Sequence, residues 1–298
     1  MSLPNFIIIG APKAGSTSLY HYVGQHPDVF TSRVKEPRFF WTHRTSAHTE
    51  TLDEYEKLFQ GSERFQAVGE GSPAYLADEN TPRLIKDLIP DVKLIAILRD
   101  PYERAFSQFV FLRLRKTERE ATFLAAIEAD EALDLAQKVG YVENSLYHRN
   151  LSRYLSVFSP EQIKVVLLED LQERPPEVMK EVFSFLDVDP SVDVDTSEKL
   201  TQSGVPHLSA MHWFLSDRNP IKRLLGPLVP KAAKKIIRRI RTANLRKQTL
   251  SMADRRALAP YFDDDVEQLE TLLNRDLSHW LAGSTRHPSQ GEPNRRNS

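Results

Sequence analysis

A lysine between two glycines gives this chain its first chemical signal. Lys13 lies in the segment Gly10-Ala11-Pro12-Lys13-Ala14-Gly15-Ser16-Thr17-Ser18, directly after the apolar run Phe6-Ile7-Ile8-Ile9. Free N–H groups at the start of a helix and a nearby cation both attract a phosphate or another oxyanion. The segment therefore predicts an anion site made of Lys13, Ala14, Gly15, Ser16, Thr17 and Ser18, with the three hydroxyls as candidate helix caps.

The same glycine spacing occurs in the loop GxxxxGK[ST] that binds nucleoside triphosphates. In that loop a lysine follows the second glycine directly, because it must reach the terminal phosphates. Here Ser16 occupies that place, and the lysine stands earlier, at position 13. The segment therefore differs from the triphosphate loop, and a plain strand-to-helix turn is the alternative interpretation.

A second cation follows a second apolar run. Arg99 comes directly after Val92-Lys93-Leu94-Ile95-Ala96-Ile97-Leu98 and precedes Asp100-Pro101, with Ser107 further along the helix that Pro101 begins. An arginine at a strand end can bind a phosphate dianion through two parallel hydrogen bonds, whereas the alternative is an Arg99 that only pairs with a neighbouring acid. Two such sites at two strand ends suit a nucleotide with phosphates at both ends.

Two glutamates are candidates for proton transfer. Glu36 precedes Pro37, which favours extended backbone, and the aromatic residues that follow would raise its pKa toward the range of a general base. The alternative is a surface pair of Lys35 with Glu36. Glu70, which ends a predicted strand, is the second candidate, as an acid, a base or a group that orients the acceptor. Its alternative is a carboxylate that only accepts hydrogen bonds from loop amides.

The elements that must position these side chains alternate between strand and helix. Apolar runs at 6–9, 65–70, 92–98 and 163–168 predict strands, and helical spacing predicts helices near 51–59, 81–88, 109–136, 145–155 and 177–186. This alternation is typical of an α/β fold, with a P-loop-like central parallel sheet of four to five strands flanked by helices. We expect one domain over residues 1–282, with a helical C-terminal cap, and a disordered polar tail over 283–298.

Composition narrows the functional classes. The 298 residues carry 40 Lys and Arg against 41 Asp and Glu, and no cysteine. A net charge of −1 does not mark a nucleic-acid-binding protein, and a chain without cysteine has neither disulfides nor thiolate metal sites. No apolar run is long enough to span a membrane. We therefore expect a cytoplasmic protein that needs no metal, whose oligomeric state the sequence does not define.

Two basic regions have several interpretations. The segment 217–248 is rich in Lys and Arg, and between Arg218 and Lys247 it lacks Asp and Glu. It is a solvated lid helix, an anchor for the nucleotide or an acidic acceptor, or a helix in peripheral contact with a membrane surface. The shorter cluster is by default a solvated helix face, with a role on the acceptor side as the alternative. Its members are Arg113, Arg115, Lys116 and Arg119.

Together these segments resemble the sulfotransferases that use 3′-phosphoadenosine-5′-phosphosulfate (PAPS), and in particular a bacterial relative of the heparan-sulfate or Golgi-type branch. Residues 12–19 are similar to its PKxGTTxL loop, and residues 98–109 to its LR[DN]PxxRxxSxY motif. Residues 35–40 and 69–76 are similar to its KEPxFF and GExSPxYL segments. Further similarity at 145–155 and 258–280 extends the resemblance over residues 5–280.

The resemblance implies a reaction and a set of roles. Lys13 would neutralise the leaving phosphate oxygen, the amides of 15–18 would hold the 5′-phosphate, and Arg99 with Ser107 would bind the 3′-phosphate. Glu36 would take the proton of the acceptor hydroxyl, and Tyr147 would reach the acceptor or the cofactor. The products would be a sulfate ester and 3′-phosphoadenosine-5′-phosphate (PAP). Arg246 and Lys247 lie about where relatives close a loop over the cofactor phosphate.

Two positions depart from the branch that this chain resembles. Arg38, a candidate acceptor contact, stands where that branch has histidine, and Gly71 stands where relatives often have a lysine after Glu70. These changes disfavour an extended polyanionic acceptor, so the acceptor hydroxyl is expected on a carbohydrate, lipid, polyketide or other small molecule. The rival functions are an ATP-dependent kinase and a catalytically idle nucleotide-binding or scaffold protein.

Overall fold

A five-stranded parallel sheet forms the centre of the molecule. The computed structural model describes residues 3–43, 49–134, 137–197 and 249–284, with two further short strands at 205–206 and 245–246. The strand order is β2-β3-β1-β4-β5, and all neighbours run parallel. The strands are β1 (Phe6–Gly10), β2 (Val29–Thr31), β3 (Ala67–Gly71), β4 (Lys93–Leu98) and β5 (Ile163–Leu167). The predicted α/β class with a parallel sheet is confirmed.

The central strand β1 is buried along its whole length. Ile7 lies between Glu70 of β3 and Leu94 of β4, which sets the register of the three strands that carry the predicted site. Ile7 and Ile9 point into one core, whereas Phe6 and Ile8 point into the other. Because each such side chain contributes about 1.5–3 kcal/mol when fully buried, a strand between two helical layers is apolar at every position.

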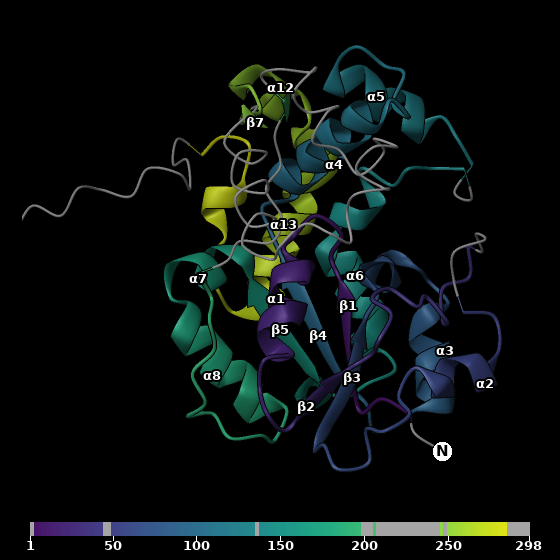
Figure 1. Ribbon diagram of the computed structural model, residues 1–298. Coiled ribbons are helices and arrows are strands. Elements are labelled where there is room, and N and C mark those ends of the chain that lie inside the picture. Colours follow the sequence, from purple (N-terminus) through teal and green to yellow (C-terminus); the bar gives the residue numbers. More distant parts are fainter. Residues whose placement is uncertain are drawn as a thin grey trace, which may run out of the picture.

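Helices cover both faces of the sheet (Figure 1). On one face, α1 (Ser16–Val23) and α8 (Pro175–Phe185) pack against Phe6 and Ile8. On the opposite face, α3 (Thr81–Leu88), α6 (Tyr147–Leu155) and α13 (Ala259–Leu273) pack against Ile7 and Ile9. The carboxyl ends of the strands stay open to the loops that follow them, where parallel sheets carry their ligand sites.

A third apolar cluster lies beyond those strand ends, where Figure 1 shows α4, α5 and α12. It joins α4 (Pro101–Arg115) and α5 (Phe123–Glu131) to Phe262 of α13 and to Leu250 and Leu258, which flank α12 (Met252–Ala257). The helix expected near 109–136 is thus two helices. Lys116 ends α4 in the left-handed conformation, with φ 59°, and the Thr122 hydroxyl caps the start of α5. The C-terminal helices confirm the predicted helical cap.

Short elements complete the chain. They are α2 (Leu52–Lys57), α7 (Leu168–Glu173) and the 3₁₀ helices η1 (Pro73–Ala77), η2 (Glu143–Ser145), η3 (Pro160–Gln162) and η5 (Ser278–Trp280). β6 (Val205–Pro206) and β7 (Leu245–Arg246) pair antiparallel. Apart from β7, the basic segment 217–248 lies outside the described residues, as do 285–298 of the predicted tail. Among the helices described, none combines the length and the apolarity needed to cross a bilayer.

Candidate functional site

The turn between β1 and α1 requires a glycine at position 15. Gly15 has φ 97°, and a Cβ there would lie 2.7 Å from Cδ1 of Leu168. Gly15 is also the N-cap of α1 and makes no side-chain cap bond, so the expectation that Ser16, Thr17 or Ser18 caps the helix is wrong. Ser16 and Thr17 instead form the first turn of α1, whose leading amides have no acceptor within a helix. The N–H of Ser18 already donates to the Gly15 carbonyl at 2.9 Å, so the amides of Ser16 and Thr17 are the ones that can bind an anion.

Lys13 brings a buried ammonium to the same turn. Its Nζ lies 4.1 Å from the ring centroid of Phe111 in α4. Among the ion pairs of the described residues, none includes Lys13. Burial and the positive charges of Arg99, Arg104 and Arg115 lower the pKa of Lys13 to about 8. An anion bound here would compensate for those losses and favour the charged lysine.

Arg99 joins the two predicted anion sites. It follows β4, and its Nη1 donates to the main-chain oxygen of Lys13 at 3.4 Å. Its Nη2 pairs with Glu103 at 3.0 Å, so the neighbour pair weighed for Arg99 also exists. The residues that follow β1 and β4 are therefore in contact, with Arg99 held against the backbone of Lys13.

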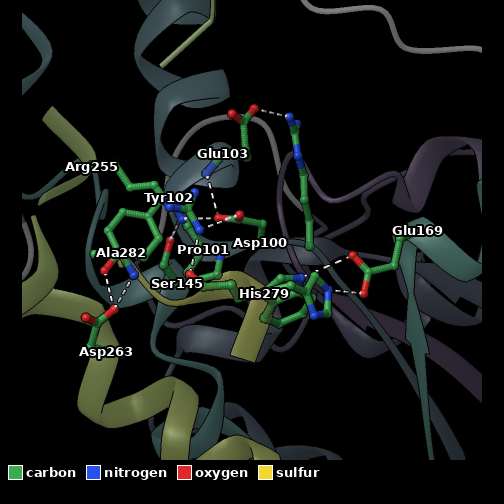
Figure 2. A network of polar contacts seen from close by, with 12 residues as sticks. Asp100, Pro101, Tyr102, Glu103, Ser145, Glu169, Arg255, Asp263, His279 and Ala282 are labelled. Atoms are coloured by element: carbon green, nitrogen blue, oxygen red, sulfur yellow. Dashed lines mark hydrogen bonds and ion pairs between the residues drawn. The ribbon is translucent and has the colours of Figure 1, made fainter. Parts of the chain in front are cut away.

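The helix that follows Arg99 is fixed by a buried acid (Figure 2). Asp100 accepts from the backbone N–H groups of Tyr102 and Glu103 at 3.0 and 3.2 Å, which caps α4. Its other oxygen pairs with Arg255 of α12 at 2.8 Å. Burial raises the pKa of Asp100, and Arg255 counteracts this rise. Breaking such a buried pair costs about 3–5 kcal/mol, so α12 helps to hold the Arg99 strand end.

Further C-terminal residues reach the same strand ends (Figure 2). Tyr102 donates to Asp263 of α13 at 2.5 Å. Glu169, just after β5, lies 2.9 Å from His279 Nε2 and accepts from Trp280 Nε1 at 3.1 Å. The hydrogen bond with Glu169 raises the pKa of His279. Residues after 249 are therefore part of the framework of the site.

Arg104 belongs to this framework, and our sequence reasoning gave it no role. It is fully buried, and its guanidinium donates to the Ser145 hydroxyl at 2.5 Å and to the Tyr141 carbonyl at 2.6 Å. Burial lowers its pKa to about 10. The signal was available, since this arginine stands within the segment that also holds Arg99 and Ser107. It fastens α4 to the loop before α6.

Ser107 and Tyr147 are both buried. Ser107 lies on α4 and is 3% exposed, whereas Tyr147 begins α6 and is 0% exposed. Burial raises the pKa of Tyr147, and the charges of Arg104 and Arg99 oppose that rise. The structure thus places the phenol near the arginines of the predicted donor site and closed to solvent.

Glu36 lies in a loop held against β3. Its N–H donates to the Gly71 carbonyl at 3.2 Å, and the N–H of Arg38 donates to the Ser72 hydroxyl at 3.1 Å. Glu36 and Arg38 have φ angles of 60° and 56°. The expectation that Pro37 keeps Glu36 extended is therefore wrong, because tertiary hydrogen bonds outweigh the local preference.

The charge of Glu36 is also set by its neighbours. Lys35 and Arg38 pair with its two oxygens at 2.9 and 2.6 Å. Burial raises the pKa of Glu36, but the charges and hydrogen bonds of Lys35 and Arg38 outweigh it and hold the pKa below its ordinary value. The expected upward shift is wrong, since cations, not aromatic rings, contact the carboxylate. Glu36 is therefore ionised at neutral pH.

Glu70 lies beneath that loop and is 0% exposed. The hydroxyls of Ser72 and Tyr55 donate to its two oxygens at 2.8 and 3.4 Å. Burial raises the pKa of Glu70 to about 7, although these hydroxyls lower it. Its partners are thus side-chain hydroxyls, and not the loop amides that were the alternative for Glu70. Through Ser72, Glu70 is one residue away from the backbone of Arg38.

The position after Glu70 is tightly packed, so a side chain there would require Tyr20 to shift slightly. A Cβ at Gly71 would lie 3.0 Å from Cδ2 of Tyr20, whose hydroxyl donates to the Ser32 carbonyl at 2.9 Å. Tyr20 thus fills the space beside Gly71. The remaining predicted site residues are Arg246, described only as backbone in β7, and Lys247, which lies outside the described residues.

One acidic group has the spacing of metal ligands, and it lies away from the strand ends. Asp130, Glu131 and Glu143 have carboxylates within reach of one another. Lys138 pairs with Glu131 and Glu143 at 2.9 and 2.6 Å, and Asp130 accepts from three backbone N–H groups, those of residues 139, 140 and 141. A lysine therefore already neutralises this group.

Comparisons with known proteins agree with the geometry. The model of the sulfotransferase domain family matches residues 3–212. A crystal structure of a sulfotransferase from Alicyclobacillus acidocaldarius superposes with a TM-score of 0.73 at 28% identity, covering 94% of this chain and 99% of that one.

Curated relatives are also similar over much of the chain. Mouse carbohydrate sulfotransferase 15 is 29% identical over an alignment of 301 positions. The alignment covers 79% of this chain and 51% of the relative. Human bifunctional heparan sulfate N-deacetylase/N-sulfotransferase 3 is 30% identical over 212 residues, which cover 67% of this chain and 24% of the relative. The chain thus spans about half the length of the first of these relatives and less of the second. With the family model matching most of its length, the chain belongs to the sulfotransferase family of enzymes.

Proposed function

We propose that this protein transfers the sulfuryl group of PAPS to the hydroxyl of an acceptor molecule. The observation that carries the proposal is the contact between Arg99 and the Lys13 carbonyl at 3.4 Å, which unites the ends of β1 and β4. A nucleotide with a phosphate at each end needs two anion sites within one ligand length, and this contact supports the proposal that the two strand ends provide them.

The residues on the donor side suit such a ligand. The leading amides of α1 and the ammonium of Lys13 match the 5′-phosphosulfate, because both are donors to an anion. Residues 15–17 are the proposed source of those amides, with Gly15 giving the close approach, because the N–H groups of Ala14 and Ser18 already donate to the carbonyls of Ala11 and Gly15. Arg99 and Ser107 match the 3′-phosphate, and Arg246 and Lys247 are further candidates for it. When bound, PAPS supplies the activated sulfuryl group.

Glu36 is the proposed general base. Its carboxylate takes the proton of the acceptor hydroxyl while the acceptor oxygen bonds to sulfur and the bond from sulfur to the phosphate oxygen breaks. Lys13 neutralises the charge that grows on that leaving oxygen. An ionised carboxylate is required for this role, and Lys35 and Arg38 keep Glu36 ionised. The same two cations lower its basicity, so the acceptor must displace at least one of them for Glu36 to take the proton.

Glu70 is the second candidate acid or base, and its burial favours action through the loop. Its oxygens contact Ser72 and Tyr55, so it orients the segment that carries Glu36 and Arg38. Arg38 is the proposed acceptor contact from the loop. Tyr147 of α6 lies near Arg99 and Arg104 and is proposed to act on the cofactor side.

The proposed acceptor carries a hydroxyl on a carbohydrate, lipid, polyketide or other small molecule. Named relatives act on carbohydrates, which favours a sugar. Two features disfavour an extended polyanion: Arg38 is already paired with Glu36, and Tyr20 fills the place of the lysine that relatives carry next to Glu70. A cytoplasmic location and a bacterial source remain predictions from the sequence.

The test is a transfer assay with ³⁵S-labelled PAPS and a metabolite extract, followed by a library of pure hydroxyl compounds. We expect a labelled product that appears only with the active protein, and PAP binding by calorimetry. Magnesium-dependent ATP turnover without labelled product would support a kinase instead. PAP binding without transfer to any acceptor would support the idle nucleotide-binding protein.

A further inference from the structure

Two cations contact the same aromatic ring in α4. The Nζ of Lys13 lies 4.1 Å from the ring centroid of Phe111, and the guanidinium carbon of Arg115 lies 4.4 Å from that centroid. Both distances are within the range of a cation–π contact. Residues 111 and 115 are four apart on one helix, so α4 itself places the exposed Arg115 over the ring.

The surroundings of Lys13 show why this ring matters. The charged groups that act on its ammonium are Arg99 after β4, Arg104 and Arg115 on α4, and Glu36 in the loop. Three of these four repel the ammonium. Glu36 attracts it from a distance while pairing with Lys35 and Arg38. The face of the Phe111 ring is therefore the close attractive partner of Lys13.

We propose that Phe111 is a positioning residue for Lys13: its ring seats the ammonium at the strand ends, and Arg115 opposes that seat from the same ring. The inference deepens the proposed function, on which the catalytic role of Lys13 rests. An aromatic seat fits that role better than a carboxylate. A carboxylate would neutralise the lysine and would repel an incoming phosphate, whereas a ring face does neither.

The direct test follows the Lys13 ammonium by NMR, in protein labelled at the lysine side chains, across a pH titration. The Lys13 signal is assigned from its loss in Lys13→Arg. Phe111→Leu removes an attraction, so the Lys13 pKa should fall by roughly half a unit. Arg115→Gln removes a repulsion, so the pKa should rise by a similar amount. A purely structural role for the ring does not predict Lys13 pKa shifts of opposite sign in the two variants.

Turnover gives the second measurement. We expect Phe111→Leu to lower kcat by roughly tenfold with little change in PAP binding, because positioning acts on the transition state more than on the bound donor. The pH above which kcat/KM for PAPS declines should be lower in Phe111→Leu and higher in Arg115→Gln than in the wild type. Phe111→Tyr keeps a ring face and should restore kcat.

Phe106→Leu is the matched control. Phe106 lies on the same helix, and its ring packs against Phe109 and Phe123 instead of a cation. Equal kcat values in Phe111→Leu and Phe106→Leu, or pKa shifts of the same sign in the Leu and Gln variants, would overturn the inference. Arg115 is exposed, so Arg115→Gln keeps the test decisive if Phe111→Leu does not fold.

The two proposals fail in different ways. If Lys13→Ala keeps full turnover, the catalytic role of Lys13 is wrong, while the NMR titration still decides whether Phe111 seats its ammonium. If Lys13→Ala abolishes turnover and Phe111→Leu behaves like the control, the proposed function stands and the inference about the ring is wrong.

Discussion

The donor side and the acceptor side of the site balance charge in opposite ways. At the ends of β1 and β4, Lys13 is buried among three arginines and takes part in no ion pair of the described residues. In the loop on β3, Glu36 is already paired with two cations, Lys35 and Arg38. The donor side thus has an uncompensated positive charge, and the acceptor side has a compensated negative one.

This difference separates two tasks of a transferase. A site that must bind a polyanion gains from cations whose repulsion only the ligand relieves. A base must be ionised before the reaction begins, and neighbouring cations achieve this at neutral pH. The comparison therefore predicts that variants on the two sides change different quantities.

The largest expected effect is that of Glu36→Gln, which removes the base and keeps its shape. We expect turnover to fall about a thousandfold, because general base catalysis contributes factors of this order. PAP binding, measured by calorimetry, should stay near the wild-type value. Glu56→Gln on α2 is the control. Normal turnover in Glu36→Gln would contradict the assignment of Glu36 as the general base.

Glu70→Gln tests the buried carboxyl beneath that loop. The pKa of Glu70 is about 7 in the folded protein and near 4.3 in an unfolded chain. Between these values the folded state binds more protons, so the free energy of unfolding should fall as pH rises, by about 3 kcal/mol in total. Urea denaturation from about pH 5 to about pH 8 measures this slope. In Glu70→Gln the free energy of unfolding should lack this part of the pH dependence. Equal pH dependence in the wild type and the variant would contradict the raised pKa of Glu70.

Lys13→Ala probes the donor side. We expect turnover to fall about a hundredfold, since removing one donor to a developing oxyanion has this effect in other transfers. The comparison is sharpened by pH: kcat/KM for PAPS, which reports the free enzyme, should decline above a pKa near 8, where Lys13 loses its charge. Lys57→Ala, an exposed lysine of α2, serves as control. Unchanged turnover in Lys13→Ala would count against the donor assignment.

Arg99→Met should give the smallest change, in affinity. Loss of a charge-assisted hydrogen bond to a phosphate should weaken PAP binding by about tenfold. Adenosine 5′-phosphate, which lacks the 3′-phosphate, should bind the wild type and Arg99→Met equally. Arg83→Met on α3 is the control. If both ligands lose the same affinity, Arg99 does not contact the 3′-phosphate.

The sheet was predictable from sequence because its central strands are buried on both faces. Continuous apolar runs such as Phe6–Ile9 can only be accommodated between two helical layers, and the residues that follow them must lie at the strand ends. This reasoning located both Lys13 and Arg99. It needed no knowledge of distant contacts, because both residues follow closely after an apolar run in the sequence.

The rest depended on residues far apart in the chain. The backbone of Glu36 follows hydrogen bonds to Gly71 and Ser72, and these override the preference set by Pro37. Its pKa follows Lys35 and Arg38, whose side chains local patterns cannot orient. The contact of Phe111 with Lys13 joins a helix and a turn from different parts of the sequence. Such contacts leave no periodic signal in the sequence.

The fastening of the C-terminal helices has a consequence for biosynthesis. Arg255 pairs with Asp100, both oxygens of Asp170 contact Arg275, and Glu169 contacts His279 and Trp280. During translation β1 to β5 leave the ribosome first. The acidic residues at the strand ends lack their C-terminal partners until residues 249–284 have also been synthesised. A nascent chain stopped before residue 249 would carry the sheet with Asp100 uncompensated. We therefore expect the nucleotide site to mature last, only after the final helices are released.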